Sequence, residues 1–268
     1  MAGPTPRTPL APVLQRVSQT GYEALQRTHR EYFNCREITE CDASALRPYF
    51  FVCPNVEMEE YVVWVVKSGD SHVCALTTDG VGGCIVTCAV GTNVDGDTVL
   101  YMAHSAIFVG PVAFDHALKV MCLDAGCQPA DVRIYVLGGE AAEVDDSGRA
   151  TEELVYEELF DCLPAYPEVK GVNVPIRPWA LDQDQEPGTA VVLTSDGRIS
   201  FCRSNDLPAD GRTLPGGETI VPPDERERAA IALLRQRQTL AARAASVAPT
   251  LERSWLDDLV VTTAPSQP

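Results

Sequence analysis

The sequence has no long apolar run and comparatively few basic residues. None of its apolar segments approaches the roughly 20 residues that a membrane-spanning helix needs. The opening residues, MAGPTPRTPLAP, lack the apolar centre of a secretory signal. With 21 Lys and Arg against 38 Asp and Glu, the net charge is −17, so the chain repels phosphate backbones and anionic lipid. These absences predict a cytoplasmic protein with no membrane span and no nucleic-acid partner, and they leave open secretion without a cleaved signal peptide.

Paired cysteines are also missing. The ten cysteines are scattered, and none forms a C-x-x-C pair or a Cys/His cluster with zinc-finger spacing. The sequence therefore predicts no metal site and no cofactor. In a long chain without a secretory signal, most of the thiols are expected to be reduced and buried as small apolar side chains.

The hydrophobic pattern predicts an α+β fold. Short β-branched and apolar runs bounded by turn residues predict strands, and segments with helical spacing predict helices, one of which places His116 on its polar side. Hairpins are expected between the first two strands, between the next two, and around Ser195-Asp-Gly197. The expected strands are 60–66, 71–77, 84–90, 98–106, 132–137, 172–176, 189–194 and 198–203, and the expected domain helices are 114–125 and 151–162.

Composition divides the chain into five segments. A Pro-rich disordered tail and an N-terminal extension precede one large domain, and a Pro/Gly-rich linker connects that domain to a helix with good intrinsic propensity. In order, these segments are 1–12, 13–55, 56–206, 207–223 and 224–268. On the C-terminal helix, Ile231, Leu234 and Leu240 form an apolar face that is expected to pack against the domain.

Acidic residues gather in one stretch. Residues 140–161 hold nine of them against Arg149 alone. Such a stretch is typical of a solvated surface, and it would also suit a docking surface for a basic partner.

The segment Ala75–Ser105 brings together a thiol, a glycine-rich turn and a histidine. Cys84 follows Gly82 and Gly83, which allow a tight turn with backbone N–H groups free to hold an oxyanion. His104 ends the following strand, and a histidine near a cysteine activates the thiol or accepts its proton. The residues alone leave open whether Cys84 is a nucleophile or a cysteine of the core.

Several motifs in the same order resemble the chemoreceptor glutamine deamidase (CheD) family, which shares its fold and Cys–His site with the deamidase domain of the cytotoxic necrotizing factor toxins. The stretch 78–84 (TDGVGGC) is similar to the family's Thr and L-G-S-C turn, although Gly83 stands where the family usually has Ser. The strand ending at 101–104 (YMAH), the helix at 114–126 and the strand 132–141 (VRIYVLGGEA) follow in the family's order.

This resemblance implies a CheD-like β-sandwich with two helices packed on it. The helical extensions that the residue pattern predicts at both ends of the chain lie outside the family pattern. The resemblance implies that Cys84 is the nucleophile, His104 its general base and Thr78 the group that orients the imidazole. The implied reaction is hydrolysis of glutamine side-chain amides on a protein substrate, as in a deamidase of chemotactic or effector type.

Two further functions fit the same residues. A CheD-like fold without active chemistry would be a protein-binding module, which the departure at Gly83 and the acidic surface would suit. A transglutaminase, or a hydrolase of small amides, would form the same acyl-enzyme with Cys84 and differ only in the acceptor or the substrate.

Overall fold

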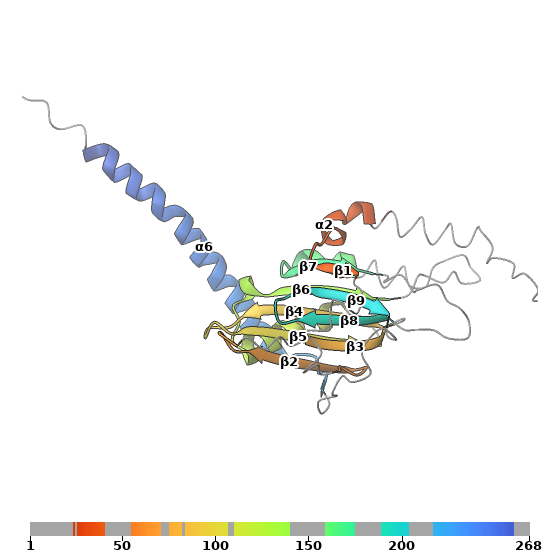
Figure 1. Cartoon of the computed structure of the whole chain (residues 1–268). Helices are drawn as coiled ribbons and strands as arrows, with labels where there is room; N and C mark the ends of the chain where they lie inside the picture. The colour runs from red at the N-terminus through yellow and green to blue at the C-terminus, as the bar shows by residue number, and fades with distance from the viewer. Residues whose placement is uncertain are drawn as a thin grey trace, which may run out of the picture.

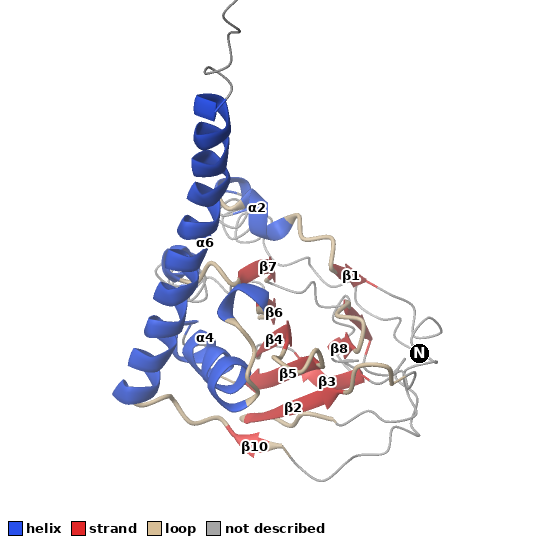
Figure 2. Cartoon of the chain, turned by 90° about the vertical axis from the view of Figure 1, so that its left-hand side faces the viewer, coloured by secondary structure: helices blue, strands red, loops and turns tan. Residues whose placement is uncertain are grey.

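Two β-sheets face each other, and helices cover one of them (Figures 1 and 2). The mixed content agrees with the predicted α+β class. The computed structural model describes residues 24, 26–40, 55–70, 75–81, 84–106, 110–139, 159–174, 189–203 and 217–259. The predicted tail at 1–12, most of the acidic stretch (140–158), Gly82 and Gly83, and part of the linker (207–216) lie outside these residues.

The larger sheet has six strands in the order β10-β2-β5-β4-β6-β7. All neighbours are antiparallel except β6 and β7, which pair in parallel. The predicted hairpin of residues 84–90 with 98–106 is confirmed by the pairing of β4 with β5. The strands are β2 (Glu60–Val66), β4 (Ile85–Thr92), β5 (Thr98–Ser105), β6 (Arg133–Gly138), β7 (Val169–Asn173) and β10 (Glu218–Thr219).

The smaller sheet has four strands in the order β1-β9-β8-β3. The predicted hairpin at Ser195-Asp-Gly197 is confirmed as the β8–β9 connection. The predicted hairpin between 60–66 and 71–77 is wrong, because β5 and β10 occupy the two edges of β2 and β3 pairs with β8 instead. The strands are β1 (Ile38–Glu40), β3 (Ala75–Val81), β8 (Thr189–Thr194) and β9 (Ile199–Arg203).

The central strands β4 and β5 are buried on both faces. Successive side chains of a strand point to opposite faces. Ala89 and Tyr101 pack in the core under the helices, whereas Cys88 and Met102 pack in the core between the two sheets. This double burial accounts for the almost unbroken apolar runs of both strands.

Helix α4 (Gly110–Leu118) continues into a π-helical segment, Lys119–Asp124, and both lie on the larger sheet (Figure 2). The predicted helix at 114–125 is thereby confirmed, although it begins earlier, at Gly110. Of the predicted helix at 151–162, only 159–162 are described, and they are helical.

The predicted polar placement of His116 is wrong. Its side chain is only 1% exposed, and its Nδ1 lies 2.7 Å from the hydroxyl of Tyr101. The ring of Tyr61 packs edge-on against the imidazole. A buried imidazole is tolerated when a neighbouring group satisfies its hydrogen bonding, and here the Tyr101 hydroxyl does so.

The buried His116 gives the fold a pH dependence. Burial, together with Lys119, lowers the pKa of His116 from 6.5 to about 4. The unfolded chain therefore binds one more proton at this residue between those two values, so stability decreases as the pH falls through that range. We expect the free energy of unfolding to fall as the pH is lowered from 6.5 towards 4, and to fall less in His116→Gln. Urea titrations of both proteins across this range measure the difference, and parallel curves would contradict it.

Helix α6 (Glu225–Leu259) begins with a reciprocal cap. The Asp224 N–H donates to the Glu227 carboxylate, and the Glu227 N–H donates back to Asp224, both at 2.8 Å. This capping box satisfies N–H groups that the first helical turn leaves unpaired. No helix within the described residues is long and apolar enough to cross a membrane.

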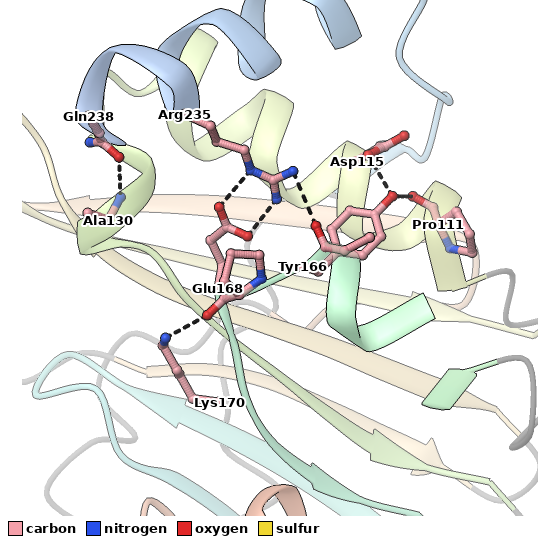
Figure 3. Close-up of polar contacts among 10 residues, drawn as sticks. Pro111, Asp115, Ala130, Tyr166, Glu168, Lys170, Arg235 and Gln238 are labelled. Carbon is pink, nitrogen blue, oxygen red and sulfur yellow. Dashed lines mark hydrogen bonds and ion pairs between the residues drawn. The ribbon is translucent and has the colours of Figure 1, made fainter. Parts of the chain in front are cut away.

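The first part of α6 is anchored to the domain (Figures 1 and 3). Arg235 Nε donates to the buried Glu168 carboxylate at 2.8 Å, and the side-chain oxygen of Gln238 accepts from the Ala130 N–H at 3.0 Å. Of the predicted apolar face, Ile231 is buried and Leu234 packs against the core. Leu240 is 57% exposed, so its predicted packing is wrong, and the helix extends away from the domain beyond this region.

Candidate active site

Two of the predicted site residues meet at one end of the sandwich. Thr78 lies in β3 of the smaller sheet, and His104 lies near the end of β5 in the larger sheet. The Thr78 hydroxyl oxygen is 2.7 Å from His104 Nδ1, and both side chains are buried. The contact therefore joins the two sheets through residues that sequence reasoning had linked only by resemblance.

The Thr78 hydroxyl also determines which nitrogen of His104 carries the proton. Thr78 Oγ1 is 2.6 Å from the backbone carbonyl of Val56, which can only accept a hydrogen bond. The single hydroxyl proton is thus directed to Val56, and the oxygen must accept from His104 Nδ1. A neutral imidazole protonated at Nδ1 has its lone pair at Nε2. Among the described residues nothing hydrogen-bonds to this buried Nε2, which is therefore available as a base.

Burial controls the charge of His104. The side chain is only 4% exposed, and desolvation lowers its pKa below the ordinary 6.5. The Val56 carbonyl and the carboxylates of Asp79, Glu57 and Glu59 act in the opposite direction without reversing the shift. The neutral imidazole, which is the form that can accept a proton, is therefore favoured at neutral pH.

The strand register places Cys84 one diagonal step from His104. Val86 pairs with His104 and Ile85 pairs with Ser105, so Cys84, immediately before β4, comes opposite Ala106. Since side chains alternate, Cys84 and His104 belong to the same face of the sheet, the face toward the smaller sheet. Diagonal neighbours of this kind are about 7–8 Å apart at Cα, and the Cys84 sulfur forms no hydrogen bond with His104 Nε2 in this structure.

Two glycines at the end of β6 fix the backbone of Cys84. The Gly139 N–H donates to the Cys84 carbonyl at 2.8 Å. Gly138 has a φ of +120°, and a Cβ at this position would come within 2.3 Å of the same carbonyl oxygen. Only glycine permits both this φ and this close approach. The sequence had indicated that the strand runs into Gly138-Gly139, but not that the pair contacts the cysteine.

The turn before β2 supplies two site neighbours that sequence reasoning missed. Met58 is 56% exposed, and its sulfur is 3.9 Å from the Cys84 sulfur. Among the described residues, Glu59 is the only non-glycine with a positive φ, +66°. Its N–H donates to the His104 carbonyl, and its carboxylate accepts from the Ala106 N–H, each at 2.7 Å. Glu59 thus binds the backbone at the end of β5 at two points, His104 and Ala106.

The expected tight turn from Thr78 to Gly83 is in part a strand with a bulge. β3 runs on to Val81, and its register with β8 shifts between Thr78 and Val81. Gly80 adopts a φ of +66°, and the bulge leaves Asp79 exposed while Thr78 and Val81 stay buried. Bulges of this type redirect side chains and are frequent beside active sites. The role predicted for Gly82 and Gly83 stays a prediction, because both lie outside the described residues.

Four of the six other described cysteines are buried and poorly placed for nucleophilic chemistry. Cys88, Cys122, Cys127 and Cys202 are buried, as predicted for most thiols, and all seven described cysteines are free of disulfides. Burial raises the pKa of Cys122 to about 12 and that of Cys127 to about 11. Such thiols stay protonated at neutral pH and react slowly.

The hydroxyl of Thr78 provides a direct test of the inferred imidazole orientation. Thr78→Val removes the hydroxyl with little change in shape, whereas Thr78→Ser retains it. We expect an activity that depends on His104 to fall by about 10- to 100-fold in the valine variant, because a misaligned base costs this much. The serine variant is expected to stay close to the wild type. Nitrogen NMR of the His104 ring follows the tautomer independently, and an unchanged Nδ1 proton in Thr78→Val would contradict the assignment.

No protein-family model matches the chain, and no curated protein sequence matches it. The chemistry is therefore inferred from the site. Within the described part of the chain, no group of three or more His, Cys, Asp or Glu is placed to hold a metal ion. The site offers a partly exposed thiol and a buried imidazole with a defined tautomer on one face of a sheet end.

Proposed function

We propose that the chain is a cysteine-dependent protein-glutamine deamidase built on a CheD-like sandwich. The observation that carries the proposal is the Thr78–His104 contact, beside which His104 Nε2 has no hydrogen-bond partner among the described residues. The β4–β5 register, continued by one residue, puts Cys84 one diagonal step from His104. The order of motifs that resembles the CheD family supports the same assignment of the three residues.

In the first half of the reaction, His104 Nε2 accepts the Cys84 thiol proton while the sulfur attacks the carboxamide carbon of a glutamine side chain. The C–S bond forms and the carbonyl π electrons move to oxygen. As the tetrahedral intermediate collapses, the imidazolium returns the proton to the leaving nitrogen. The C–N bond breaks, and ammonia leaves a thioester on Cys84.

In the second half, water takes the place of the thiol. His104 accepts a proton from the water as its oxygen attacks the thioester carbon. The C–S bond breaks, the sulfur regains a proton from the imidazolium, and a glutamate side chain is released. The neutral imidazole that Thr78 orients is the starting state of both halves, since each begins with a proton transfer to Nε2.

Access to Cys84 favours a substrate presented by another macromolecule. The thiol is partly exposed at the end of the sheet, and the adjacent Met58 is largely solvent-exposed. Such a position can receive a glutamine side chain that projects from a folded protein or peptide. The CheD resemblance implies the same class of substrate.

Ammonia release from glutamine-containing peptides and proteins tests the proposal. Mass spectrometry of the product should show the small mass increase that accompanies conversion of an amide to a carboxylate. Added primary amines separate the alternatives, since a transglutaminase would attach the amine and a deamidase would favour water. Free glutamine serves as the small-amide substrate. Absence of ammonia release, together with retained binding of a protein partner, would overturn the proposal in favour of a binding module.

A further inference from the structure

Negative charge and one apolar side chain form the rim of the candidate site. Met58, beside the Cys84 sulfur, stands between Glu57 and Glu59, and all three residues of this turn are exposed. A substrate side chain that approaches Cys84 therefore passes close to this turn. We call Glu57, Met58, Glu59 and Asp79 the acidic rim.

Asp79 adds a negative charge from a different segment of the chain, and this charge also acts on the imidazole. It follows Thr78, whose hydroxyl contacts His104, and the β3 bulge leaves its side chain exposed. Glu59 binds the His104 backbone through its own N–H. Carboxylates from two separate segments, Glu57 and Glu59 in one and Asp79 in the other, thus interact electrostatically with one buried ring.

The rim charges are not neutralised within the described part of the chain. No Lys or Arg there forms an ion pair with Glu57, Glu59 or Asp79. Their recorded partners are neutral donors: the Asn55 side-chain amide binds Glu57 at 2.9 Å, and the Ala106 N–H binds Glu59 at 2.7 Å. Uncompensated charge at a site entrance attracts ligands of the opposite sign.

The buried His104 Nε2 is a polar atom with no hydrogen-bond partner among the described residues. Its side chain is 96% buried, and nothing within the described residues satisfies this nitrogen. Buried polar atoms are normally hydrogen-bonded, and a functional site is one explanation of an exception. A polar group of a bound molecule would complete the hydrogen bonding of the ring, on which the rim carboxylates act.

We propose that the acidic rim selects glutamines that are flanked by lysine or arginine in the substrate. The rim carboxylates attract the cationic end of such a side chain. Met58 offers an apolar surface for its aliphatic stem. This inference rests on the proposed deamidase function and specifies its substrate class.

Three short peptides with a single glutamine test the selection. The glutamine is flanked by two lysines, by two alanines or by two glutamates. We expect kcat/KM to change by roughly two- to fivefold for each charge at low salt, in favour of lysine, because exposed charge pairs contribute modestly. The preference should weaken in about 0.5 M NaCl, where screening shortens the range of the attraction.

Charge-reversed variants show whether the rim causes the preference. Glu57→Lys and Asp79→Lys, alone and together, are expected to reduce and then reverse the preference for lysine. Asp95→Lys is the matched control, because it makes the same charge change in the exposed loop at the far end of the β4–β5 hairpin. We expect this variant to keep the wild-type preference.

Binding of the same peptides to Cys84→Ala, followed by fluorescence anisotropy, separates this inference from the proposed function. Ammonia release at rates independent of the flanking charge would overturn the rim inference and leave the deamidase proposal standing. If Cys84→Ala bound the lysine-flanked peptide most tightly but the wild type released no ammonia, the selectivity of the rim would be supported and the deamidase proposal overturned. A preference that survives both charge reversals would also overturn the role of the rim.

Discussion

Replacing Cys84 with serine is expected to lower the rate of ammonia release by at least about 10³-fold. A serine hydroxyl ionises far less readily than a thiol, so it depends much more on the neighbouring base. Burial lowers the pKa of His104, which makes its imidazole a weaker base than an exposed histidine. The pair is therefore suited to deprotonate a thiol and poorly suited to deprotonate an alcohol. Initial rates of ammonia release with the preferred peptide measure the loss.

Cys162→Ser is the matched control for this substitution. The Cys162 thiol donates to the Leu159 carbonyl at 3.0 Å, and serine can keep that hydrogen bond. Cys162 packs against the core under the helices, whereas Cys84 belongs to the opposite face of the larger sheet. We expect this control to keep its activity and both variants to show the wild-type circular dichroism. A Cys84→Ser protein with the full rate would show that another group is the nucleophile.

Replacing His104 with asparagine is expected to reduce activity by about 10²- to 10⁴-fold, the usual contribution of a general base. The asparagine amide nitrogen can occupy the position of Nδ1 and donate to Thr78, so the link between the sheets is retained. No atom replaces Nε2. The variant therefore removes the proposed base and spares the contact that holds the two sheets together.

The pH dependence of the rate distinguishes loss of the base from a structural defect. In the wild type, kcat/KM should fall on the acid side as His104 becomes protonated. Because burial lowers the pKa of His104, this fall should lie below pH 6.5. The residual activity of His104→Asn should lack that acid limb. If kcat/KM of His104→Asn fell at acid pH as it does in the wild type, the titrating group would be a residue other than His104.

The central strands could be predicted from sequence because their signals are local. β4 and β5 are long apolar runs separated by Asn- and Gly-containing turn residues, and their pairing needs only a short connection. The Ser195-Asp-Gly197 turn indicated the β8–β9 hairpin for the same reason. The residues alone had already linked Cys84 with His104, and resemblance to the CheD motifs added Thr78.

The partner of β3 could not be predicted in this way. A strand that follows another after a short turn usually pairs with it, yet β3 pairs with β8, more than a hundred residues further along the chain. The pairing of β3 depends on which strand edges are available and on how side chains pack between the two sheets. No local sequence pattern encodes either of these. The same limit applies to His116, whose burial depends on the hydroxyl of Tyr101.

For some residues of the site, the residue type alone did not indicate the role that the structure shows. Glutamate is not favoured at positive φ, so nothing in the sequence marked Glu59 as the residue that holds the end of β5. Met58 lies beside Cys84 because of the turn before β2, and an isolated methionine predicts no role. Gly138 was recognised only as a strand end, since its contact with the Cys84 carbonyl comes from a neighbouring strand.

The origin of Thr78 and His104 in opposite sheets has a consequence for biosynthesis. The hydroxyl reaches the imidazole only after the two sheets have docked, and pairings distant in sequence form slowly in β-rich proteins. A newly made chain with formed but undocked sheets would carry an unoriented His104 and an ordinary thiol. The contact that orients His104 therefore forms only when the two sheets dock.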